Sequence, residues 1–277
     1  MSKVWFITGA ARGLGREIAD AALSAGDGVV ATARKPEKIL ESLGASDRLL
    51  ALPLDVADQN QTESAVAAAV NRFGRVDVLV NNAGYGQLGY FETVEADAIR
   101  KQYETNVFGI FNVTRAVLPG MRQRRSGHIL NLSSIGGLVG FGGGSIYGST
   151  KFAVEGFSEG LAQELRPLGI WVTIVEPGFF RTDFLDNSSV TYGTRNIEDY
   201  AEAAATLRDE YEARNHKQLG DPKRLGAALV QVVQSDNPPL RFAAGSDAVK
   251  LTQDTLEARR IELDRWHELS VTTDMKK

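Results

Sequence analysis

Seven short apolar runs, several of them rich in β-branched residues, alternate with longer helical patterns along this chain. Such alternation is typical of a parallel β-sheet covered by helices on both faces. The sequence therefore predicts a doubly wound α/β fold. The predicted strands are Val4–Thr8, Val29–Ala33, Leu49–Leu54, Val76–Asn81, His128–Ser133, Trp171–Glu176 and Leu240–Ala244.

The 277 residues contain no linker, low-complexity tract or break in composition. We therefore expect a single domain over residues 1–277, since single α/β domains often reach this size. An irregular, aromatic stretch at about 179–220 interrupts the alternation and predicts a substrate-binding insertion.

A C-terminal helix is expected at about 246–269. Val249, Leu256, Leu263 and Trp266 would share one face of this helix. The favoured interpretation is that this face packs on the chain's own core, and a contact with another subunit is the alternative.

Composition excludes several classes of function. The chain has no cysteine and only three scattered histidines, so we expect no metal site. A net charge of −4 offers no field that would attract nucleic acid. No apolar run is long enough for a membrane span, and no export segment opens the sequence, so a cytoplasmic location is expected.

A glycine-rich turn follows the first predicted strand and precedes a helical run. Its sequence is T-G-A-A-R-G-L-G, from Thr8 to Gly15. Glycines let backbone N–H groups approach a pyrophosphate, and the helix N-terminus adds partial positive charge. The turn therefore predicts a dinucleotide site, with a purely structural turn as the alternative. The residues assigned to it are Gly9, Arg12, Gly13, Leu14 and Gly15.

The end of the second strand indicates which dinucleotide is bound. An NAD site usually has an acid there, which binds the ribose 2′-hydroxyl. This strand instead ends in Ala33-Arg34-Lys35. Arg34, with Arg12 able to approach the same place, would bind the 2′-phosphate of NADP. We therefore expect NADP(H), with NAD(H) as the less favoured cofactor.

Tyr147 and Lys151 are four residues apart, so on a helix they occupy the same face. A neighbouring ammonium can lower the pKa of a phenol from about 10, which would suit Tyr147 to acid–base catalysis. Taken alone, the pair could be an exposed pair on a helix. The surrounding sequence favours a catalytic role for the pair. Ser134 and the Asn82-Ala83-Gly84 turn each follow a predicted strand, at the edge where such sheets bind ligands.

These motifs, in this order and spacing over roughly residues 3–245, resemble the short-chain dehydrogenase/reductase family in its shorter, single-domain branch. The resemblance implies a Rossmann-type sheet of seven strands in the order 3-2-1-4-5-6-7. It also implies a catalytic tetrad. Tyr147 would be the proton donor or acceptor, Lys151 would hold the ribose and lower the tyrosine pKa, and Ser134 would orient the substrate oxygen. Asn106 would anchor a proton-relaying water.

The resemblance extends to the rest of the cofactor site. Asp55 and Val56 resemble the pair that contacts adenine, while Pro177, Gly178 and Thr182 resemble the segment that holds nicotinamide. Family members commonly associate through the helix that carries the tyrosine, so a homodimer or homotetramer is expected.

The expected function is NADP(H)-dependent hydride transfer between NADPH and a ketone or aldehyde, or an alcohol in reverse. The substrate is expected to be largely apolar, in a pocket shaped by Leu138, Phe141 and the insertion. A catalytically silent NADP-binding sensor is the alternative. The G-x-S-x-G run around Ser158 matches a hydrolase nucleophile motif, but it falls inside a predicted helix rather than at a strand-to-helix turn.

Overall fold

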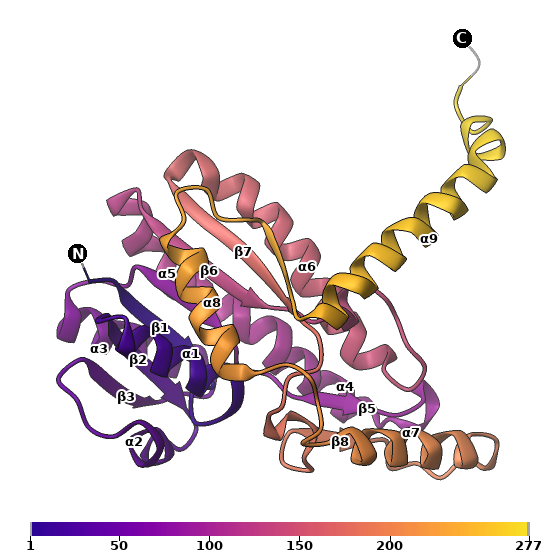
Figure 1. Ribbon diagram of the computed structural model, residues 1–277, viewed down its shortest axis with the longest axis horizontal. Helices are drawn as coiled ribbons and strands as arrows, with labels where there is room; N and C mark the ends of the chain where they lie inside the picture. The colour runs from indigo at the N-terminus through magenta and orange to yellow at the C-terminus, as the bar shows by residue number, and fades with distance from the viewer. Residues whose placement is uncertain (1, 276–277) are drawn as a thin grey trace.

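The computed structural model describes residues 2–275, so Met1 and residues 276–277 of the predicted domain range lie outside it. Seven parallel strands form the central sheet in the order β3-β2-β1-β4-β6-β7-β9. The strands β5 and β8 form a separate two-stranded sheet. When only the strands of the central sheet are counted, their order is the predicted 3-2-1-4-5-6-7, and the fold class is confirmed (Figure 1). The central strands are β1 Val4–Thr8, β2 Gly28–Ala33, β3 Leu49–Pro53, β4 Val78–Asn81, β6 Gly127–Leu132, β7 Ile170–Pro177 and β9 Arg241–Ala244.

Helices cover both faces of the sheet because successive strand residues point to opposite faces. Trp5 and Ile7 of β1 pack into a core with α1, α2 and α8, whereas Phe6 between them joins a second core with α3, α5 and α6. The α-helices are α1 Gly13–Ser24, α2 Glu37–Leu43, α3 Gln59–Phe73, α4 Ala96–Tyr103, α5 Gly109–Arg124, α6 Ser145–Leu165, α7 Ala201–Arg214, α8 Pro222–Gln234 and α9 Ser246–Val271. Within the described residues, no helix is long and apolar enough to cross a membrane.

The segment that the sequence predicts as irregular, about 179–220, contains regular structure. It holds β8 (Val190–Tyr192), which pairs in parallel with β5 (Gly86–Leu88), and it holds α7. A three-residue strand is too short to show a period in sequence, and α7 has no buried residue to create one. The pairing brings the inserted segment over the turn that follows β4.

The expectation that α9 packs on its own core is wrong for most of the helix. Val249, Leu256, Leu263 and Trp266 are 44%, 62%, 63% and 51% exposed, and Ala248 is the one buried residue of the helix. Figure 1 shows α9 leaving the body of the molecule. Two contacts anchor its N-terminal half: Asp247 accepts a hydrogen bond from the Phe179 backbone N–H (2.7 Å), and Arg259 donates to the Leu138 carbonyl (2.5 Å).

His128 on β6 is buried, with Nε2 2.9 Å from the Thr173 hydroxyl on β7. Burial lowers the pKa of His128 to about 4. An unfolded chain takes up this proton below about pH 6.5 and the folded chain only near 4, so folding stability falls as the pH falls through that window. We expect a loss of about 3 kcal/mol from this group, at ~1.4 kcal/mol per pH unit.

Urea unfolding at pH 7.0 and 4.5 measures this loss. His128→Gln should be less stable at pH 7.0 but should lose less stability on acidification than the wild type. An equal loss in both proteins would show that other groups control the acid sensitivity.

Candidate active site

One large cleft of about 1760 Å³ opens at the carboxyl edge of the sheet, where the parallel strands end. Most of the predicted site residues line it. These are Gly9, Arg12, Gly13, Leu14, Arg34, Asp55, Val56, Asn82, Ala83, Gly84, Ser134, Tyr147, Lys151, Pro177, Gly178 and Thr182. Gly15 and Asn106 lie behind the lining, where they contact Asn82 and Gly84 respectively.

The glycine turn fits an anionic group of a nucleotide. A Cβ on Gly15 would stand 2.4 Å from Asn82 Nδ2 and 2.6 Å from the Gly9 carbonyl oxygen, so this position has room only for glycine. No side chain caps the N-terminus of α1 at Arg12, and the first turn contains no acidic residue. Its N–H groups are therefore available to an anion such as a pyrophosphate.

Basic side chains gather at the end of β2. Arg34, Lys35 and Lys38 all line the cleft. Sequence reasoning missed Lys38, although its spacing of four from Arg34 was the available signal. The Arg12 guanidinium instead donates to Ser188 O and Ser189 Oγ, at 2.9 and 2.7 Å. The joint role of Arg12 with Arg34 therefore stays a prediction.

Thr8 is a second residue that sequence reasoning missed. Its hydroxyl accepts hydrogen bonds from the backbone N–H groups of Asn82 and Ala83, both at 3.0 Å. The Asn82 side chain in turn donates to the Thr8 and Gly9 carbonyls, at 2.9 and 3.1 Å. These bonds fix the turn after β4 against the glycine turn after β1.

Tyr147 is buried in the cleft, with Ser134 beside it. A Cβ on Gly136 would lie 3.4 Å from the Tyr147 ring and 3.6 Å from Ser134 Oγ, so the tyrosine ring and the serine hydroxyl both lie beside this glycine. Burial raises the pKa of Tyr147 to about 12, and the Ser134 hydroxyl opposes this rise. The pKa of Tyr147 is thus raised where a lowering by Lys151 was expected, because burial penalises the charged phenolate.

The inserted segment causes much of that burial. The rings of Phe184 and Tyr147 lie 5.9 Å apart, and Leu185 and Val190 join Tyr147 in one apolar cluster with Leu88. The segment therefore covers the tyrosine and excludes water from it.

Lys151 lies one helical turn beyond Tyr147 on α6, as the spacing predicts. Its Nζ is 5.7 Å from the centre of the Tyr147 ring and donates to the Leu132 carbonyl at 2.8 Å. Burial lowers the pKa of Lys151 to about 8, whereas Glu155 acts to raise it. The ammonium form is therefore the main form at neutral pH.

Asn106 occupies a π-helical turn, Glu104–Phe108, between α4 and α5. Such turns are rare and often occur at functional sites. The Asn106 side chain accepts from the Tyr85 N–H (3.2 Å) and donates to the Tyr85 carbonyl (3.0 Å) and to Thr150 on α6 (3.3 Å). It thus connects the turn after β4 to the helix of Tyr147.

Ser158, the serine of the G-x-S-x-G run, cannot act as a nucleophile elbow. It lies in the middle of α6, is fully buried, and donates to the Val154 carbonyl at 2.6 Å. A hydrolase requires this serine at an exposed strand-to-helix turn.

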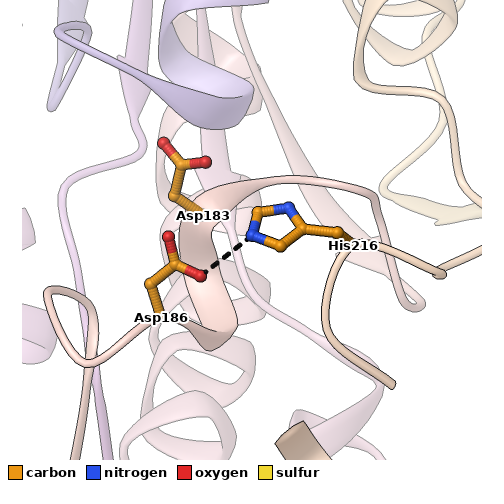
Figure 2. A group of neighbouring side chains, drawn as sticks. All are labelled: Asp183, Asp186 and His216. Carbon is orange, nitrogen blue, oxygen red and sulfur yellow. Dashed lines mark ion pairs between the residues drawn. The ribbon is translucent and has the colours of Figure 1, made fainter. Parts of the chain in front are cut away.

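His216, one of the three scattered histidines, lies beside two acids. Figure 2 shows Asp183, Asp186 and His216, each with one potential ligand atom, and these atoms lie within 4.8 Å of one another. Asp186 Oδ1 lies 3.1 Å from His216 Nε2 and also accepts from Asn215 Nδ2 at 2.6 Å. These contacts hold the two ends of the inserted segment together.

Comparison with known proteins identifies the family. The model of the family described as "short chain dehydrogenase" matches residues 3–193. Oxidoreductase BOA17 of Botryotinia fuckeliana is 40% identical over 99% of this chain and 100% of its own length. A 3-ketodihydrosphingosine reductase of Bacteroides thetaiotaomicron is 40% identical over 88% of each chain. The chain therefore belongs to the short-chain dehydrogenase family and is an oxidoreductase of that class.

Solved structures agree with this assignment. A short-chain dehydrogenase from Streptomyces avermitilis superposes with a TM-score of 0.91 at 43% identity, covering 99% of this chain and 100% of that one. A serine dehydrogenase complexed with NADP+ superposes with a TM-score of 0.73 at 28% identity, covering 86% and 93%. The nucleotide-binding fold is thus shared with proteins that bind nicotinamide dinucleotides.

Proposed function

We propose that this protein is an NADPH-dependent carbonyl reductase, which converts a ketone or aldehyde to an alcohol. The observation that supports it is the convergence of Tyr147, Ser134 and Lys151 in a buried part of the cleft, beside the glycine turn. A phenol with a pKa of about 12 stays protonated at neutral pH, as a proton donor requires.

The four residues would divide the work. Bound NADPH supplies the hydride. Ser134 donates a hydrogen bond to the substrate oxygen and orients it toward Tyr147, which donates the proton. The Lys151 ammonium binds ribose hydroxyls and stabilises the phenolate that forms when Tyr147 donates its proton. Asn106 holds Tyr85 in the turn beside the cleft and positions water for the return of the proton.

The cofactor site favours NADPH over NADH. Arg34, Lys35 and Lys38 offer three cations at the end of β2, where an NAD site has an acid. Asp55 and Val56 would bind the adenine, and Pro177, Gly178 and Thr182 the nicotinamide. The similar serine dehydrogenase was solved with NADP+, in line with this choice.

The substrate is a largely apolar carbonyl compound. Beyond Tyr147 the cleft is lined by Leu88, Phe141, Phe184 and Leu185, and by Leu251 at the root of α9. Leu138, expected in the pocket, lies outside this lining. One relative, 40% identical, is named a 3-ketodihydrosphingosine reductase, and that name specifies a ketone substrate. Residues 1–277 would act as one domain in which the 179–220 segment selects the substrate.

A spectroscopic assay tests the function. Purified protein with NADPH and a panel of aliphatic, aromatic and long-chain ketones should oxidise NADPH with at least one of them, and more slowly with NADH. Binding of NADPH without turnover of any carbonyl compound would favour the NADP-binding sensor instead.

We further propose that the chain forms a homodimer or homotetramer. On α6, nothing lies within 4 Å of a Cβ built on Gly156 or Gly160, so another helix can approach there closely. The exposed apolar residues of α9 offer a second contact surface. Sedimentation analysis should give at least twice the 30.0 kDa chain mass. Trp266→Ser should weaken association if α9 takes part, and a monomeric wild type would refute the proposal.

A further inference from the structure

A buried network of charges lies directly behind Lys151. Glu155 follows Lys151 by one turn of α6, is 5% exposed, and pairs with Arg241 of β9. Arg241 also binds Glu176 of β7 and Glu159 of α6, both at 2.7 Å. One guanidinium therefore serves three carboxylates, two of which are buried.

The network touches both parts of the proposed site. Glu176 directly precedes Pro177 and Gly178, the segment proposed to hold nicotinamide. On the other side, a Cβ on Gly137 would lie 3.1 Å from Glu155 Cγ, 3.1 Å from the Lys151 carbonyl oxygen and 2.6 Å from Ser133 Oγ. The Glu155 side chain and the Lys151 carbonyl oxygen thus both lie beside Gly137.

Glu155 and the Ser133 hydroxyl are both buried beside Gly137, and Arg241 pairs with the Glu155 carboxylate. Burying a carboxylate is costly unless a positive charge compensates it, and Arg241 supplies one such charge. Opposite charges interact strongly where water is excluded, so Glu155 can in turn stabilise the Lys151 ammonium one turn away on α6.

We propose that Glu155 is a positioning residue, which keeps Lys151 charged and directed into the cleft while Arg241 holds Glu155 in place. The inference rests on the proposed function only because that function gives Lys151 its role in binding ribose and stabilising the Tyr147 phenolate. Burial lowers the pKa of Lys151 and Glu155 opposes that effect. Burial also raises the pKa of Glu155, aided by Glu176 and opposed by Ser133 and Arg241. The titratable and charged groups around this pair are Tyr147, Glu176, Glu159 and Arg241, with the Ser133 hydroxyl beside Glu155.

The test removes the charge without changing the shape. In Glu155→Gln the pKa of Lys151 should fall by roughly one unit, the lower end of the effect of a close opposite charge. Because the ammonium is the working form, the alkaline limb of the kcat/KM profile should move to lower pH by the same amount. Glu159→Gln is the matched control: it also loses a carboxylate bound to Arg241, but it is half exposed and two turns from Lys151. Its profile should stay as in the wild type.

A second readout is independent of turnover. Lysine-selective ¹³C NMR, with the Lys151 resonance assigned by its loss in Lys151→Arg, should show the same shift in Glu155→Gln. An unchanged Lys151 titration in a folded Glu155→Gln protein, or equal shifts in both variants, would overturn the inference. If the wild type turned over no carbonyl compound, the proposed function would fail while the NMR titration still decided the role of Glu155.

Discussion

Tyr147→Phe should abolish carbonyl reduction while leaving NADPH binding nearly intact. The substitution removes only the phenolic oxygen, and the ring keeps its packing against Phe184 and Leu88. General acid catalysis contributes about 10²–10⁴-fold, so the variant should keep less than about a hundredth of the wild-type kcat. NADPH oxidation measures turnover, and quenching of protein fluorescence measures binding.

A second tyrosine provides the control. Tyr103 on α4 donates from its hydroxyl to Ser149 Oγ on α6 at 2.9 Å, outside the cleft lining. Tyr103→Phe removes a hydrogen bond to the same helix and should keep most of the activity. A Tyr147→Phe protein with more than about a hundredth of the wild-type kcat would exclude this residue as the acid.

Arg34→Asp should shift the cofactor preference from NADPH toward NADH. The change would remove the charge-assisted hydrogen bonds that we propose Arg34 donates to the 2′-phosphate, each worth about 1.5–3 kcal/mol. At ~1.4 kcal/mol for each factor of ten, KM for NADPH should rise about tenfold to a hundredfold. The new carboxylate can accept a bond from the ribose 2′-hydroxyl of NADH, so KM for NADH should change little or fall.

Steady-state kinetics with both cofactors, at one salt concentration, measure the shift. Lys101→Asp on α4 is the matched control, since it makes the same change of charge at an exposed site away from the cleft. Equal rises in KM for NADPH and NADH would mean that Arg34 does not read the phosphate. An effect of Lys101→Asp as large as that of Arg34→Asp would mean that net charge alone is responsible.

The sheet could be predicted from sequence because its signals are local. The five inner strands are short apolar runs that are buried on both faces, whereas the edge strands β3 and β9 are partly exposed. Each of the seven lies within two residues of its predicted bounds. The strand order followed from the family resemblance. The β5 and β8 pair could not be predicted, because three-residue strands owe their existence to each other across about a hundred residues.

The residues that form the site could be predicted from sequence, but their pKa values could not. The spacing of Tyr147 and Lys151 gives their common helix face, whereas the pKa of Tyr147 depends on the inserted segment that covers it. The roles of Thr8 and of the network around Arg241 were likewise invisible, since their partners come from distant strands and helices.

By itself, the sequence determined the parallel sheet, the glycine turn and the identity of the groups that meet at the cleft, because hydrophobic periodicity and motif spacing act over a few residues. Only the tertiary structure decided how deeply Tyr147 is buried, which carboxylates stand behind Lys151, and that α9 leaves the core instead of packing on it. Those properties depend on the removal of water and on contacts between segments far apart in the chain. Neither is encoded at any single position.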